Sequence, residues 1–238
     1  GLKSIVGCEF YIAPGDRTDK KTRSVSNPLK KDKFSYHQIL LAKNETGYKN
    51  LCKLSTHSYT EGFYYKPRID KELLKQHSEG LIATTCCLAG EIPSNILYRG
   101  EGDAEKLFLE WLKLFGDDYY IELQRHGIEE QDKVNEVLIR WAQKYNVKMI
   151  ATNDVHYIHQ NQAMAHDALI CIGTGSKLDE PNRMRYQGDQ YYLRSAEEMK
   201  SLFKEFPQAI KSTIEIAERC NLELDFHKIF LPQFAPPD

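Results

Sequence analysis

The sequence predicts an α/β fold with a parallel sheet, and a barrel is favoured over an open sheet. Strand-like apolar segments alternate with amphipathic helical segments along most of the chain. This alternation is typical of parallel strands connected by helices, and its regularity favours the barrel. With 238 residues, the chain is long enough for one large domain or two small ones with a substantial core.

The first part of the chain contains two expected strands, at 4–13 and 34–42, on either side of a polar segment. Residues 16–33 of that segment carry seven basic and three acidic side chains. Such a basic loop could contact phosphates, although most charge runs are simply solvated. A helix is expected at 48–59, directly after Gly47.

The rest of the chain alternates between strands and helices. Apolar side chains at helical spacing, such as Leu107 and Trp111, identify the helices. Ser195 and Glu198 fit a capping box, which marks the start of a helix. The expected strands are 80–86, 119–123, 147–152 and 191–193, and the expected helices are 103–115, 130–145, 162–172, one after Ser195, and 208–220.

Composition excludes several classes of protein. The net charge of −2 gives no general attraction to nucleic acid, so any such contact must be local. No apolar stretch approaches the roughly 18 residues of a membrane span, and the first residues resemble neither a signal nor a transit peptide. Six cysteines in mostly apolar surroundings do not form a disulfide scaffold, so we expect a cytoplasmic protein.

The most informative segment is Val147–His156, in which an apolar strand ends directly in Asn153, Asp154 and His156. The carboxyl end of a strand in a parallel barrel is where ligand chemistry is located. Asp154 and His156 would place one oxygen and one nitrogen ligand for a divalent metal there. The alternative is a polar turn in which Asp154 caps the next element, and the local sequence leaves both interpretations open.

Three further residues lie at or near strand ends, namely Glu9, His37 and Cys87. Together with Asp154 and His156 they form a mixed set suited to zinc, manganese or iron. Each has a simpler interpretation: Glu9 as a surface strand residue, His37 as a hydrogen-bonded core histidine, and Cys87 as a small core side chain.

Several runs of sequence resemble the PHP (polymerase and histidinol phosphatase) domain of the bacterial replicative DNA polymerase III alpha subunit, over essentially the full chain. These runs are Gly7-Cys8-Glu9-Phe10-Tyr11, Leu40-Leu41-Ala42-Lys43-Asn44, Gly47-Tyr48-Lys49-Asn50-Leu51, the segment 62–70, the segment 151–157, Glu197-Glu198-Met199 and Ile216-Ala217-Glu218-Arg219-Cys220.

The resemblance implies a distorted (β/α)₇ PHP barrel with a divalent metal cluster of Zn, Mn or Fe at its mouth. Carried over by motif, the implied metal ligands are Glu9, His37, Cys87, Asp154 and His156. Asp154 and His156 are also the implied catalytic residues. Arg68, in the Lys-Pro-Arg-Ile-Asp run, is expected either to bind a substrate phosphate or to form a surface salt bridge. His126 is expected to support the site or a loop, and His166 to be structural.

Two signatures of the family are absent from this sequence, namely His-x-His and Asp-His. We therefore expect a barrel that is incomplete at the N-terminus, since the chain begins about a quarter of the way into the family pattern. The part before it would supply the first strands and roughly half of the metal ligands. We assign residues 1–230 to the PHP domain and 231–238 to a linker toward a polymerase core.

The resemblance also implies a function. The chain would be part of a DNA-directed DNA polymerase, a nucleotidyltransferase of DNA replication that uses Mg²⁺, with a metal-dependent phosphoesterase or 3′-to-5′ exonuclease site of its own. The alternative is a structural platform that stabilises the polymerase and docks a proofreading subunit. Implied partners are DNA, the polymerase core of the same chain, a proofreading exonuclease subunit and a sliding clamp, with no membrane.

Overall fold

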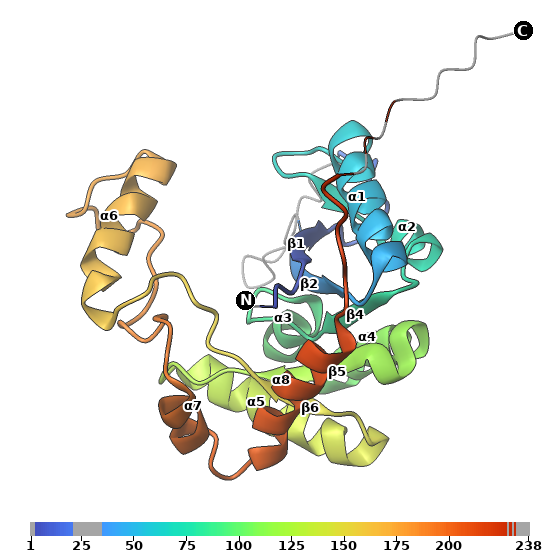
Figure 1. Cartoon of the computed structure of the whole chain (residues 1–238). Coiled ribbons are helices and arrows are strands. Elements are labelled where there is room, and N and C mark those ends of the chain that lie inside the picture. Colours follow the sequence, from blue (N-terminus) through green and yellow to red (C-terminus); the bar gives the residue numbers. More distant parts are fainter. Residues whose placement is uncertain (1–2, 21–34, 228, 230, 232–238) are drawn as a thin grey trace, which may run out of the picture.

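The computed structural model describes residues 3–20, 35–227, 229 and 231, and within them six strands form one mixed sheet (Figure 1). The strand order is β3-β1-β2-β4-β5-β6, so β3 and β6 are the edges and the described sheet does not close into a barrel. The strands are β1 (Gly7–Ile12), β2 (Tyr36–Ala42), β3 (Arg68–Ile69), β4 (Leu81–Thr84), β5 (Tyr119–Leu123) and β6 (Met149–Ala151).

The expected α/β class is confirmed, and β2 is the exception to the expected parallel pairing. Strands β4, β5 and β6 are parallel, as are β1 and β3. Strand β2 pairs antiparallel with both of its neighbours, β1 and β4.

The described residues contain eight α-helices (Figure 1). They are α1 (Glu45–Thr60), α2 (Lys71–Gln76), α3 (Glu91–Tyr98), α4 (Glu101–Phe115), α5 (Glu129–Tyr145), α6 (Ala163–Thr174), α7 (Ala196–Leu202) and α8 (Pro207–Arg219), with 3₁₀ helices at Gly116–Asp118 and Gln160–Gln162. The capping box predicted at the start of α7 is confirmed, since Ser195 and Glu198 each bond the backbone N–H of the other. Helix α1 begins earlier than predicted because Asn44 caps it by accepting from the N–H of Gly47.

Three short elements were not expected from the sequence, and one expected strand does not form as a full strand. Strand β3 and helices α2 and α3 have too few residues to show a clear period. Asp70 caps α2 by accepting from the N–H of Leu73. The strand expected at 191–193 is a single bridge between Tyr157 and Tyr192.

Alternation along the strands separates two cores. Alternate residues of β4 and β5 such as Leu81, Ala83 and Ile121 join the large core with helices α1, α2, α4 and α5. The residues between them, Ile82 and Tyr120, face the other way, and Ile216 of α8 packs against them. Strand side chains point alternately to the two faces of a sheet, so Ile82 and Tyr120 belong to the face opposite the large core, which we call the inner face.

The inner face becomes polar toward the carboxyl ends of its parallel strands. Ile82 is followed two residues later by Thr84, Tyr120 by Glu122, and Ile150 by Thr152. Because residues two apart share a face of a strand, these polar side chains continue the face that α8 covers. The polar end of this face is therefore the place at which ligand chemistry is expected.

Helix α6 and the segment that returns from it lie apart from the sheet (Figure 1). Of its 12 residues, α6 buries Cys171, whereas Met164, Leu169 and Ile172 are between 63% and 79% exposed. None of the helices in the described part of the chain has the length and apolarity that a membrane span requires. The linker expected at 231–238 lies, apart from Leu231, outside the described residues.

Candidate functional site

Glu9 and His37 lie on the inner face of adjacent antiparallel strands. His37 of β2 is directly opposite Tyr11 of β1, and Glu9 is two residues from Tyr11 on the same face. The His37 Nδ1 atom is 2.8 Å from the Glu9 Oε1 atom. Glu9 is in the middle of its strand rather than at the end.

Cys87 reaches His37 through the tight turn after β4. The N–H of His37 donates to the carbonyl of Ala89 at 3.1 Å, and the N–H of Gly90 closes the turn by donating to the carbonyl of Cys87 at 2.8 Å. A Cβ at Gly90 would lie 2.6 Å from the carbonyl oxygen of Thr85, so this turn requires glycine. As a result, the Cys87 Sγ atom lies 3.8 Å from the His37 Nδ1 atom.

These three groups set one another's charge. Hydrogen bonds to Cys87 and Glu9 raise the pKa of His37 to about 9. The pKa of Cys87 falls to about 4 through hydrogen bonds from the Cys86 thiol and from His37. The hydrogen bond from His37 also lowers the pKa of Glu9.

Asp154 follows β6 in a left-handed backbone conformation, with φ +42°. This conformation is uncommon for a residue other than glycine and often marks a functional turn. Burial raises the pKa of Asp154 to about 7, and the negative charges of Cys87, Glu122 and Glu9 add to the rise. Asp154 therefore shares the electrostatic environment of residues from β1, β5 and the turn after β4.

His156 is held by hydrogen bonds at both ring nitrogens. Its Nδ1 atom is 2.6 Å from the carbonyl oxygen of Asp154, and the hydroxyl of Tyr186 lies 2.8 Å from its Nε2 atom. The Nδ1 bond to a carbonyl favours the tautomer in which Nε2 accepts. The ring also contacts the rings of His166 and Tyr186, with centroids 5.4 and 4.5 Å away.

Sequence reasoning missed how firmly Asn153 fixes this turn. The buried Asn153 amide donates to the carbonyls of Gln190 and Tyr192 at 2.8 and 2.7 Å. His126, for which we expected a supporting role, lies with its Nε2 atom 3.0 Å from the Asn153 carbonyl oxygen and its Nδ1 atom 2.8 Å from the Gln131 amide. In the sequence, the signal for this structural role was the polar residue Asn153 directly before Asp154.

Glu122 is a buried carboxyl that no motif identified. Its oxygens accept from the hydroxyls of Thr84 and Thr152, both at 2.6 Å, and from the amide of Gln124 at 3.0 Å. Burial raises its pKa despite these bonds. It links the carboxyl ends of β4, β5 and β6 and adds negative charge beside Asp154.

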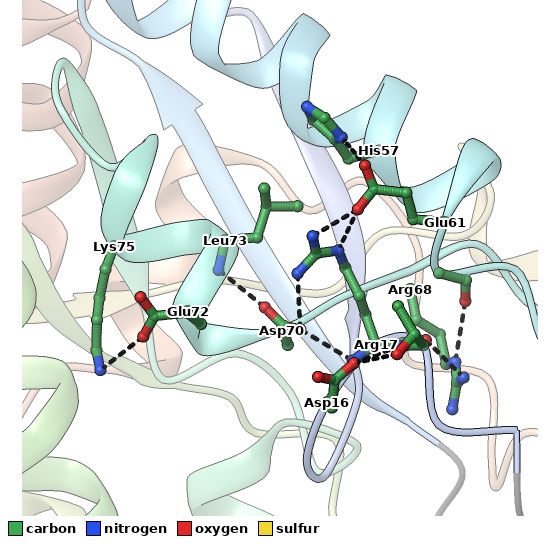
Figure 2. A network of polar contacts seen from close by, with 11 residues as sticks. Asp16, Arg17, His57, Glu61, Arg68, Asp70, Glu72, Leu73 and Lys75 are labelled. Carbon is green, nitrogen blue, oxygen red and sulfur yellow. Dashed lines mark hydrogen bonds and ion pairs between the residues drawn. The ribbon is translucent and has the colours of Figure 1, made fainter.

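Arg68 of β3 pairs with Tyr11 of β1, on the face that carries Glu9 and His37, and its side chain belongs to a network around Arg17 (Figure 2). Its buried guanidinium donates to the carbonyls of Gly62, Arg17 and Asp19 at 3.2, 3.0 and 2.9 Å. These bonds fasten the start of the basic loop to the turn before β3. Whether Arg68 also binds a substrate phosphate stays a prediction.

Arg17 is the first basic residue of the segment 16–33, and ion pairs hold it in place (Figure 2). Its Nε atom is 2.8 Å from the Glu61 Oε2 atom, and its Nη1 atom is 3.0 Å from the Asp70 Oδ2 atom. Asp70 also caps α2, so one carboxylate ties the loop to the helix. Residues 21–33 of the segment, which include the lysines at 30, 31 and 33, lie outside the described residues.

The cluster fits a divalent metal in its chemistry. Carboxylate, imidazole and thiolate are the donors that zinc, manganese and iron use, and three of them meet around the Nδ1 atom of His37. Within residues 3–20 and 35–227, however, no three His, Cys, Asp or Glu side chains are arranged so as to hold a metal ion. The donors present therefore suit part of a metal centre rather than a complete one.

Comparison with known proteins identifies the family. A profile of the PHP domain matches residues 1–126, which is more than half of the chain. The chain belongs to the PHP domain family. Glu9, His37 and Cys87 lie within the matched residues, and Asp154 and His156 follow them.

Curated relatives of this PHP chain are similar to it along its whole length. The chain is 45% identical to the DNA polymerase III subunit alpha of Borreliella burgdorferi, 43% to that of Treponema pallidum and 41% to that of Thermus aquaticus. Each match covers 100% of this chain and 20% of the relative. The chain thus spans about a fifth of the length of the curated relatives that it matches.

Proposed function

We propose that the chain acts as the PHP domain of a DNA polymerase III alpha subunit, and that its polar strand ends form part of a divalent metal centre for phosphoester hydrolysis. Glu9, His37, Cys87, Asp154 and His156 would hold zinc, manganese or iron. A divalent cation bound there would act as a Lewis acid on a phosphoester and activate water. The parent polymerase would use Mg²⁺ for DNA synthesis in the cytoplasm.

The meeting of three donor groups, with the Glu9 Oε1 atom 2.8 Å and the Cys87 Sγ atom 3.8 Å from the His37 Nδ1 atom, is the observation that carries the proposal. The carboxyl of Asp154 is partly buried near groups of the same sign, and this costs free energy unless a cation is present. A bound cation would offset that repulsion and leave Asp154 ionised. Soluble folds rarely collect acidic groups at one sheet end without such compensation, and sites of this kind are often functional.

Other residues of the chain would orient the ligands and the substrate. The Asp154 carbonyl accepts from His156 Nδ1, so the Nε2 atom of His156 is presented for coordination once the Tyr186 hydroxyl moves away. His126 and Asn153 hold the turn that carries both ligands. In the parent protein the proposed reaction is the removal of a nucleotide from the 3′ end of a DNA strand.

Metal content tests the proposal directly. The purified chain, exposed to zinc, manganese or iron and then dialysed, is expected to retain metal, as measured by elemental mass spectrometry. Asp154→Asn should lower the affinity by at least about 10- to 100-fold, the range for losing an outer-shell partner of a metal ligand. The exposed Asp179→Asn serves as the matched control. Equal retention by Asp154→Asn and the control would overturn the proposal.

A docking platform is the second candidate function, and the exposed apolar side chains of α6 favour it. Leu169 and Ile172 are 63% and 79% exposed, and apolar patches of this kind often mark protein contacts. We infer that this surface docks a proofreading subunit. Leu169→Asp together with Ile172→Asp should weaken binding of that subunit at least tenfold in surface plasmon resonance, and Ile214→Asp on α8 should not. Unchanged binding by the double variant would exclude α6 as the docking site.

A further inference from the structure

A pocket of about 420 Å³ lies between α6 and the returning segment at 185–188, beside the candidate metal site. Its volume is in the range of pockets that bind small organic ligands, about 300–1,000 Å³. The rings of Tyr157, His166 and Tyr186 line it, together with the aliphatic side chain of Ile170. Arg185 and Gln187 add polar groups to its wall.

The rings in this wall form a cluster that continues to the ligands. The ring centroids of His166 lie 5.3 Å from Tyr157 and 5.2 Å from Tyr186. Tyr186 in turn hydrogen-bonds the Nε2 atom of His156 at 2.8 Å. A ligand in the pocket is therefore one side chain away from a proposed metal ligand.

We propose that this pocket is a nucleobase subsite, which holds the base of the terminal nucleotide while its phosphate lies at the metal cluster. The inference rests on the proposed function and names the part of the substrate that this function leaves unassigned. Aromatic side chains that line a pocket stack with bases of any sequence. The Gln187 amide and the Arg185 guanidinium can donate hydrogen bonds to the acceptors on a base edge.

The geometry favours a base over an apolar ligand or a peptide. A base is flat and has a polar edge, which matches a pocket lined by rings together with amide and guanidinium groups. In a nucleotide the sugar separates the base from the phosphate, so a base in this pocket leaves room for its phosphate near His156, which the Tyr186 hydroxyl contacts. Arg183, which pairs with Asp167 at 2.5 Å, keeps that lining carboxylate neutralised and so limits its repulsion of a phosphate.

The first test uses fluorescence on the unaltered 238-residue chain in EDTA, so that no metal takes part. A tetradeoxynucleotide with 2-aminopurine at its 3′ end should be quenched on binding, because stacking on an aromatic ring quenches this base. The same oligonucleotide with 2-aminopurine at its 5′ end should keep its fluorescence. Quenching at both ends, or at neither, would overturn the subsite.

The second test measures affinity by titration calorimetry. Removing the 3′-terminal base, in an oligonucleotide with an abasic last residue, should weaken binding about 5- to 140-fold, the range that stacking of one base contributes. Ile170→Trp fills the pocket and should abolish this difference, whereas Ile214→Trp on the exposed face of α8 should preserve it. Equal affinity for the two oligonucleotides with the unaltered chain would contradict the proposal.

Deoxyadenosine 5′-monophosphate distinguishes the two sources of a base. Binding of the tetranucleotide at least tenfold more tightly than the monophosphate identifies a strand end as the occupant. Equal binding identifies a free nucleotide, and either result supports a base in the pocket. Because these measurements contain EDTA, they are independent of metal retention, so failure of the subsite and failure of the metal centre are seen separately.

Discussion

At the scale of single residues, the candidate site depends on a few unusual positions at strand ends. Asp154 adopts a left-handed conformation, and Cys86, next to Cys87, does so as well with φ +63°. Both turns lie directly after a parallel strand, where the inner face becomes polar. Left-handed conformations of residues other than glycine cost about 1–3 kcal/mol, so the surrounding hydrogen bonds must stabilise these turns.

The buried carboxyl of Glu122 predicts a pH dependence of stability. Its folded pKa is raised above the usual 4.5 by burial, so the folded state binds more protons than the unfolded state above that pH. This contribution to stability is complete below about pH 4.5 and is lost as pH rises through the folded pKa.

The substitution Glu122→Gln should remove that loss while keeping the size of the side chain. Urea unfolding between pH 4 and 8 should then show a smaller decrease in the free energy of unfolding for the variant than for the unaltered chain. The exposed Glu197→Gln should leave the curve unchanged. A parallel pair of curves for Glu122→Gln and the unaltered chain would mean that Glu122 ionises normally in the folded state.

At the scale of elements, the backbone of α1 at Gly47 lies in close contact with the backbone of the loop before β4 at Gly80. A Cβ at Gly47 would lie 2.0 Å from the carbonyl oxygen of Gly80. The carbonyl of Gly80 also accepts from the N–H of Lys43 at 2.8 Å, which holds it in place. The helix can therefore lie where it does only with glycine at this position.

We expect Gly47→Ala to reduce the free energy of unfolding by about 3 kcal/mol, the upper part of the usual range for overpacking. Gly102→Ala in α4 is the matched control, because its Cβ would meet nothing within 4 Å. Alanine has the higher helix propensity, so the control should gain up to about 1 kcal/mol. Chemical denaturation measures both, and equal stability of the two variants would contradict the close contact.

The sequence predicted the long elements well, because helices such as α4 and α5 carry a clear apolar period. Strand β5 was predicted to the residue. The direction of β2 could not be predicted, since an apolar run does not encode the sense of its partner strands. The short helix α3 was missed because its eight residues begin at Glu91 without a side-chain cap.

The candidate site was predictable only where strand ends and motifs coincided. Asp154 and His156 follow a recognisable strand, and the resemblance to the PHP family added Glu9, His37 and Cys87. Whether these residues hold metal stays a prediction. Glu122 was missed because a single carboxyl inside an apolar strand has no motif. The pocket beside α6 was missed as well, since His166 and Tyr186 are 20 residues apart in sequence and meet only after folding.

At the scale of the whole molecule, stability is unevenly distributed. Helix α5 buries seven residues, five of them in the main core, whereas α6 buries Cys171. Segments with few buried contacts open at low free energy. Helix α6, which lines the proposed base subsite, is therefore expected to open at a lower free energy than α5.

Hydrogen exchange should reveal this difference. Amides of α6 are expected to exchange at least tenfold faster than those of α5 at the same pH, measured by mass spectrometry of peptic peptides. Binding of the tetranucleotide should slow exchange in α6 and leave α5 unchanged. Equal protection of the two helices without ligand would show that α6 is packed as firmly as the core.

The bonds of Asn153 have a consequence for how this fold can vary. They join the end of β6 to residues 190 and 192, and the bridge between Tyr157 and Tyr192 closes the same junction. The chain between residues 157 and 190 therefore begins and ends at the same junction of the fold. Lengthening such a loop costs little extra closure entropy. Relatives can therefore exchange residues 160–188 for segments of other lengths, and so acquire new substrate contacts, without rebuilding the sheet.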